Sequence, residues 1–191
     1  YRRQRQMCIR DRSNGDGLFG HAAIDMMRRG SKLMSIDPRV NWVSTRADWH
    51  LRLRPGTDAA LALAMMNVII NEELYDKEFV EKWTYGFDEL RERVQDYPPS
   101  KMAEVTWVPE EQIVRAARLL AKSKPAAMQW GLAVDMVKEA LPAGQAIVGL
   151  FQITGNVDIP GSNIFPVEMI AQLLHILFLT VEKHFPSEVY Y

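Results

Sequence analysis

Apolar positions recur along the chain with two different spacings, which predict short buried strands and amphipathic helices. Short apolar runs predict strands at 32–36, 50–53 and 125–130. Helical spacing predicts helices at 20–29, 58–73, 76–83, 87–96, 109–124 and 140–153. Strands that alternate with helices indicate an α/β fold, with a mostly parallel, Rossmann-like sheet flanked by helices.

Small polar segments follow the predicted strands. Asp-Pro-Arg at 37–39 follows the first strand, and Gly-Thr-Asp at 56–58 lies between the second strand and a long helix. Gly131 follows the third strand. Ligands of open α/β sheets bind beyond the carboxyl ends of the strands, so these segments are candidate binding residues.

The residue types in these segments suit a nucleotide. Asp37 can accept hydrogen bonds from ribose hydroxyls, and Arg39 offers a planar guanidinium for phosphate. Gly56 permits close approach to the backbone, Thr57 can add a hydroxyl donor, and the N–H groups that begin the next helix favour an anion. Asp58 would repel phosphate, but its carboxylate can accept two hydrogen bonds from the adjacent donors of guanine. The pattern therefore favours guanine over adenine.

A purely structural explanation fits the same residues. Asp-Pro-Arg is a common turn at a strand end, and Thr57-Asp58 can be an ordinary helix N-cap, worth about 1 kcal/mol of stability. Arg39 can pair with Asp37 or with Asp48. Neither the GxGxxG nor the GxxxxGK[ST] motif occurs, so common dinucleotide and P-loop signatures are absent. The residues alone leave both explanations open.

Composition narrows the possible partners. The 191 residues carry a net charge of −1 and are 48% apolar, which is typical of a globular domain and gives no basic excess for nucleic acid. One cysteine, Cys8, and four scattered histidines provide no metal-ligand spacing. The apolar stretch 167–181 is too short and too polar to span a bilayer. We expect no nucleic-acid partner, no membrane span in this chain, and no metal ligand; no catalytic residue stands out.

The two ends depart from this pattern. Residues 1–13 hold five arginines without any period, and QMCIRDRS resembles translated sequencing-adapter sequence. We therefore interpret 1–13 as a non-native leader rather than a basic arm for nucleic acid. Residues 165–191 predict a helical tail, which leaves 14–164 as the predicted α/β domain.

Three stretches together resemble a known family. SIDPRVNWVSTRADWHLRLRPGTDAALALAMMNVIINEELYDKEFVEKWTYGFDEL, VTWVPEEQIVRAARLLAKSKPAAMQWG and QAIVGLFQITGNVDIPGSN occur in the order found in molybdopterin oxidoreductases of the dimethyl sulfoxide reductase family. Members are large prokaryotic enzymes that hold molybdenum or tungsten on two molybdopterin guanine dinucleotides. The resemblance implies that 14–164 is part of the guanine dinucleotide-binding α/β domain of a larger multidomain enzyme.

The resemblance also implies site residues and partners. In this family the loops after the first two strands hold one guanine dinucleotide arm, which agrees with the guanine preference of Asp58. The implied cofactor-binding residues are Asp37, Pro38, Arg39, Asn41, Gly56, Thr57, Asp58 and Gly131. A 4Fe-4S cluster would belong to a cysteine-bearing N-terminal part of the parent enzyme, and an iron–sulfur subunit would be its electron-transfer partner. The chain by itself would be inactive.

Three functions therefore remain open. The chain can be a cofactor-binding fragment of a molybdenum or tungsten oxidoreductase, or a fragment of a non-redox tungsten hydratase on the same scaffold. It can also be a nucleotide-binding module without catalysis. The strand-end pattern does not separate reductases from hydratases, because the substrate pocket lies elsewhere.

Overall fold

The computed structural model describes residues 24–136, 138 and 140–163. The predicted leader 1–13, the beginning of the helix predicted at 20–29, and the predicted tail 165–191 lie outside these residues. Residues 24–28 are helical, and the turn after them ends at Gly30, whose φ of +87° is left-handed. Glycine takes this conformation without a Cβ penalty, which explains why the helix stops here.

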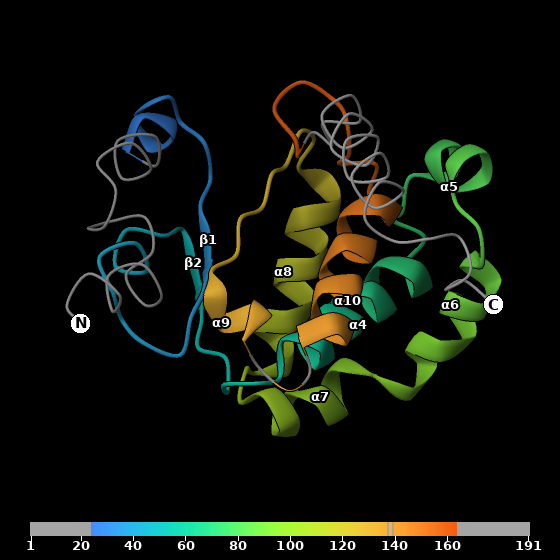
Figure 1. The fold of residues 1–191 in the computed structure, drawn as a ribbon, viewed down its shortest axis with the longest axis horizontal. Helices are drawn as coiled ribbons and strands as arrows, with labels where there is room; N and C mark the ends of the chain where they lie inside the picture. The colour runs from blue at the N-terminus through green and yellow to red at the C-terminus, as the bar shows by residue number, and fades with distance from the viewer. Residues whose placement is uncertain (1–23, 137, 139, 164–191) are drawn as a thin grey trace, which may run out of the picture.

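The described strands form a parallel pair. Strand β1 (Met34–Ile36) pairs with β2 (Trp49–Leu51), and Ser35 lies opposite His50. The parallel sheet is therefore confirmed, with two strands in the part of the chain that the structure describes. Figure 1 shows this pair at one side of the helices α8, α4 and α10.

Helices make up most of the described chain. They are α4 (Asp58–Asn71), α5 (Lys77–Trp83), α6 (Phe87–Arg93), the 3-10 turn η1 (Val94–Asp96), α7 (Pro99–Thr106), α8 (Glu110–Lys122), α9 (Leu132–Asp135) and α10 (Ala140–Ile153). The helices predicted between 58 and 153 all occur within a few residues of their expected bounds. The apolar pattern predicts neither α7 nor α9.

Helix α7 begins at a proline, a residue that often marks the end of a helix. Pro99 occupies the first helical position, where a backbone N–H is not needed and the fixed φ of proline suits the helix. The helix then ends at Trp107, which has a left-handed φ of +63°. The same residue type therefore stops the preceding helical segment and starts the next.

The third predicted strand is wrong. Residues 125–130 have no ladder partner among the described residues, and side-chain amides bind the backbone instead. The N–H of Ala126 donates to Asn156 Oδ1 at 2.8 Å, and the N–H of Met128 donates to Asn163 Oδ1 at 2.7 Å. Asn163 Nδ2 in turn donates to the Met128 carbonyl at 2.8 Å. The apolar run predicts an extended backbone but does not reveal what pairs with it.

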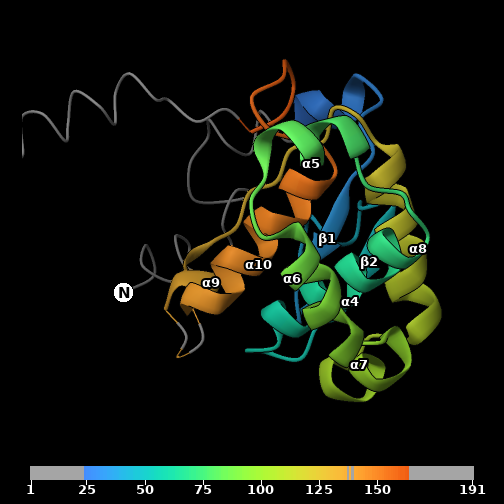
Figure 2. The same cartoon turned by 90° about the vertical axis from the view of Figure 1, so that its right-hand side faces the viewer.

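Helix α4 is the centre of the hydrophobic core. It contacts α10, α8 and α7, and Figures 1 and 2 show it in the middle of the helices. Ala64 and Ile69 have no exposed surface, and Met66 is 1% exposed. From α8, Ile113 and Ala117 are equally buried. Small residues on both helices allow close packing, which fixes the position of the first turn of α4.

A truncation in α4 should measure how far the fold depends on this helix. We expect Ile69→Ala to lower the free energy of unfolding by about 2–5 kcal/mol, because it leaves a cavity in a fully buried position. Leu141→Ala is the matched control, since Leu141 is 71% exposed. Urea denaturation of the full-length protein measures both. Equal losses in the two variants would contradict a core centred on α4.

Candidate functional site

Two loops leave the sheet at the same edge. The first loop, residues 37–46, follows β1, and the second loop, residues 52–57, follows β2 and leads into α4. Because β1 and β2 are parallel and their last residues are paired, both loops start from one carboxyl edge. This arrangement is the one that the strand-end pattern predicts.

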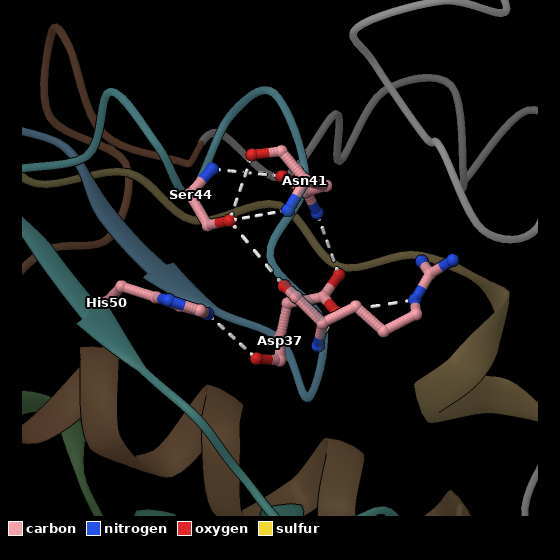
Figure 3. Close-up of polar contacts among 5 residues, drawn as sticks. Asp37, Asn41, Ser44 and His50 are labelled. Atoms are coloured by element: carbon pink, nitrogen blue, oxygen red, sulfur yellow. Dashed lines mark hydrogen bonds and ion pairs between the residues drawn. The ribbon is translucent and has the colours of Figure 1, made fainter.

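The Asp37 carboxylate organises the first loop (Figure 3). Its Oδ1 accepts a hydrogen bond from the Arg39 N–H at 2.7 Å, and its Oδ2 accepts one from Asn41 Nδ2 at 3.0 Å. Arg39 Nε also lies 3.6 Å from Oδ1. This is an Asx-turn, in which an aspartate side chain binds the backbone two residues on. The exposed Pro38 lies inside the turn.

The structural explanation therefore applies to part of the first loop. Arg39 pairs with Asp37, whereas Asp48 accepts hydrogen bonds from Lys32 Nζ at 3.0 Å and from the Leu33 N–H at 2.9 Å. A carboxylate has about four acceptor positions, so Asp37 keeps acceptor capacity beyond these bonds. Asp37 can both hold the loop and meet a ligand hydroxyl.

Ser44, within the first loop, and His50, in β2, also form hydrogen bonds with residues of this loop. The sequence pattern indicates neither residue. The Ser44 N–H donates to Asn41 Oδ1 at 2.9 Å, and the Asn41 N–H donates to Ser44 Oγ at 2.7 Å. His50 Nε2 lies 2.9 Å from the Asp37 carbonyl, which can only accept, so this nitrogen carries the proton. The contact ties β2 to the end of β1 (Figure 3). Only the strand register brings His50 there, and no pattern within one strand reveals it.

The second loop presents backbone rather than side chains. Gly56 has a φ of +81°, and a Cβ added there would meet no atom within 4 Å. The Thr57 hydroxyl donates to the Arg54 carbonyl at 2.7 Å and makes no cap hydrogen bond with α4. Thr57 therefore occupies the predicted N-cap position of α4, but its hydroxyl points back to the loop and does not cap the helix. The first N–H groups of α4 have no hydrogen bond from this side chain.

Asp58 is the first residue of α4 and is half-buried. Burial raises the pKa of its carboxyl group above the ordinary value of 3.8, and a hydrogen bond to its own backbone N–H opposes this only in part. Within the described residues no other side chain hydrogen-bonds to this group. A half-buried carboxylate without a side-chain partner is costly, and it is suited to a ligand that supplies donors.

Gly131 lies where the segment 125–130 meets α9. Its carbonyl accepts a hydrogen bond from the Val134 N–H at 3.1 Å, and a Cβ added at Gly131 would meet no atom within 4 Å. The Trp130 indole N–H donates to Asp135 Oδ1 at 2.9 Å, so this ring packs towards α9.

Across 24–163, leaving out the undescribed 137 and 139, the structure has no cluster of three or more histidine, cysteine or acidic side chains that could hold a metal ion. None of the helices in that range is long and apolar enough to cross a membrane.

Residues 18–184 match the family described as Molybdopterin oxidoreductase. The chain is 46% identical over 151 residues to acetylene hydratase of Syntrophotalea acetylenica, a match that covers 75% of this chain and 21% of that protein. It is 38% identical over 150 residues to formate dehydrogenase H of Escherichia coli strain K12, covering 78% of this chain and 21% of the relative. The structure of acetylene hydratase from Pelobacter acetylenicus superposes with a TM-score of 0.69 at 47% identity, covering 73% of this chain and 19% of that chain.

The chain therefore belongs to the molybdopterin oxidoreductase family, the dimethyl sulfoxide reductase family that its motifs resemble. It spans about a fifth of the length of the curated relatives that it matches. The similarity to the acetylene hydratase structure, at 47% identity, shows that the matching part of this chain also has the fold of the family.

The raised pKa of Asp58 predicts how stability changes with pH. Below pH 3.8 the carboxyl group is protonated in both the folded and the unfolded protein, so folding buries no charge. As the pH rises through the raised pKa, the folded protein must desolvate a carboxylate, and the free energy of unfolding falls. In full-length protein freed of ligand, we expect Asp58→Asn to unfold at higher urea concentration than the unaltered protein at about pH 7.

The difference between the two proteins should shrink as the pH falls towards 3.8. Asp88→Asn is the matched control, because the Asp88 side chain is 83% exposed. If Asp58→Asn were less stable than the unaltered protein at about pH 7, attraction of the carboxylate to the helix dipole rather than desolvation would dominate at this position.

Proposed function

We propose that this chain is the part of a molybdopterin-dependent enzyme that binds the guanine dinucleotide arm of a molybdenum or tungsten cofactor. The observation that carries the proposal is the half-buried Asp58 carboxyl group, which has a raised pKa and no side-chain partner among the described residues. It lies at the start of α4, just after the open backbone at Gly56. Guanine offers two adjacent N–H donors that fit such a group.

The remaining candidate residues support the same ligand. Gly56 and the first turn of α4 offer backbone N–H groups to a diphosphate. Asp37 keeps acceptor capacity for a ribose hydroxyl, and Arg39 is exposed beside it. Asn41 holds the first loop in place through its hydrogen bond to Asp37. A Cβ added at Gly131 would meet no atom within 4 Å, so this residue leaves room for a ligand. We propose Gly131 as the contact nearest the pterin.

These residues bind and orient; they do not make or break bonds. The cofactor, when bound, supplies the redox or Lewis-acid chemistry of its metal, and the protein sets its position and surroundings. We therefore assign no catalytic residue and no metal ligand to this chain. An enzyme of this kind would take its metal ligand and its substrate pocket from other parts of the polypeptide.

Two reactions are compatible with this role. We propose an oxidoreductase for the intact protein, with a 4Fe-4S cluster and an iron–sulfur subunit as electron-transfer partner. A non-redox hydratase is the second candidate, because the chain is 46% identical to acetylene hydratase and 38% identical to formate dehydrogenase H. The compared residues are those of a cofactor-binding domain, so their identity reflects the shared cofactor more than the substrate.

Substitution of Asp58 should weaken cofactor retention without unfolding the protein. Asp58→Asn keeps the shape but places an amide N–H₂ group against the guanine donors, so we expect retention to fall roughly tenfold or more. The measurement is the metal and the GMP released by acid hydrolysis, per mole of full-length protein after gel filtration. Asp88→Asn again serves as the control.

The two Asp58→Asn experiments together form a sharp test. Higher stability without ligand, together with lower cofactor content, is the signature of a residue kept for binding rather than for folding. Unchanged GMP and metal content in Asp58→Asn would contradict the guanine assignment. Absence of any pterin from the unaltered protein would contradict the proposed function itself.

A further inference from the structure

We infer that residues 154–163 act as a clasp that sets the position of Gln129-Trp130-Gly131, and that Asn163 is a positioning residue for the cofactor. The second half of this inference rests on the proposed function, and the first half does not. Figure 1 shows the loop beyond α10 meeting the segment that leaves α8. The clasp is defined here as residues 154–163, and the held segment as residues 123–128.

Of the clasp residues, Asn163 makes the contact that lies nearest to Gly131 in the sequence. Its side-chain Oδ1 accepts the Met128 N–H at 2.7 Å, and its Nδ2 donates to the Met128 carbonyl at 2.8 Å. One amide group therefore satisfies both backbone groups of a single residue, as a neighbouring strand would do. Met128 is three residues before Gly131, so Gly131 can lie at most roughly 10 Å along the chain from this anchor.

Asn156 makes the second polar contact and is fully buried. Its Oδ1 accepts the Ala126 N–H at 2.8 Å. Its Nδ2 donates to Thr154 Oγ1 at 3.0 Å and towards the Ser123 carbonyl at 3.4 Å. A buried amide with these partners fixes the held segment at a position two residues before Met128.

Two glycines let the clasp lie directly on the held segment. A Cβ added at Gly155 would come within 2.8 Å of Lys124 Nζ, and one added at Gly161 within 2.8 Å of Pro125 Cγ. Both glycines have positive φ, +67° and +91°. The contacts of the clasp thus fall on four residues of the held segment between 124 and 128, so the clasp, and not a sheet, determines its course.

The clasp is itself tied down. The Asp158 N–H donates to the Asn163 carbonyl at 3.0 Å, and the Ser162 N–H donates to the Ile159 carbonyl at 3.0 Å. At its other end, the Asp76 N–H donates to the Ile153 carbonyl at 2.8 Å, and Asp76 also pairs with Lys124. Hydrogen bonds within 158–163 therefore close the clasp at one end, and the contact between Asp76 and Ile153 joins its other end to the start of α5 and the end of α10. Such a loop can hold a fixed geometry.

Amide hydrogen exchange tests the clasp without any cofactor. In the full-length protein, we expect Asn163→Ala and Asn163→Asp to raise exchange of the 126–131 amides roughly fivefold or more, because each loses hydrogen bonds to Met128. Asn67→Asp is the matched control, since Asn67 Nδ2 donates to the Val94 carbonyl at 2.8 Å, far from the clasp in the sequence. Unchanged exchange at 126–131 in both Asn163 variants would overturn the clasp.

Low pH should restore the hydrogen bonds to Met128 in the Asn163→Asp variant. As the pH approaches the ordinary aspartic acid pKa of about 3.9, the introduced carboxyl group gains a proton and becomes a near-isostere of the amide, with one donor and one acceptor. Exchange at 126–131, corrected for the intrinsic effect of pH, should then return towards that of the unaltered protein, whereas Asn163→Ala should not. A general loss of stability would not show this pH profile.

Cofactor retention tests the positioning role. We expect the Asn163 variants to lose GMP and metal on gel filtration roughly fivefold faster than Asn67→Asp at matched thermal stability. Faster exchange with normal retention would confirm the clasp and overturn the role of Asn163 in cofactor positioning. If the unaltered protein holds pterin and Asp58→Asn loses it while Asn163→Ala does not, the proposed function survives and this inference fails.

Discussion

The burial of α4 is the constraint on which the rest of the structure depends. It packs against α10, α8 and α7, and the side chains of Ile69 and Ala64 are fully buried. Such packing allows no sliding of the helix along its axis, because each small shift would open cavities or create overlaps. The first turn of α4, which includes Asp58, therefore has a fixed position at the end of the second loop, which connects it to β2. The position of the candidate site is a consequence of core packing and not of the loops alone.

The two acids of the site illustrate different ways to keep a carboxylate near a surface. Asp37 is satisfied by its own loop, through the Arg39 N–H and the Asn41 amide, so it stabilises the turn whether or not a ligand is present. Asp58 has no comparable partner within the described chain, and burial raises its pKa. The first acid holds the first loop together, whereas the second keeps a half-buried carboxyl group that no other side chain of the described residues binds. Sequence alone assigns both acids the same kind of role, because it shows residue types and not their partners.

The sequence predicts the long periodic helices and the parallel pair of strands, because burial of one helix face leaves a clear period. It misses α7, since Pro99 can start a helix as well as stop one, and it mistakes 125–130 for a strand. In the site it identifies the loops but not His50 or Ser44. These residues act through hydrogen bonds to chain segments that no period connects to them. The direction of the Thr57 hydroxyl is likewise set by the turn, which the residue type does not determine.

Asparagine side chains explain why a segment without a strand partner can still be held in a fixed position. In a sheet, a neighbouring strand supplies one donor and one acceptor to alternate residues; in this fold Asn163 supplies both to Met128. Such a replacement ties the position of Gly131 to a few specific contacts instead of a long ladder. Loss of one contact would then shift this segment while the core, which α4 dominates, stays folded. Local adjustment of this segment without global unfolding is the physical consequence of the arrangement.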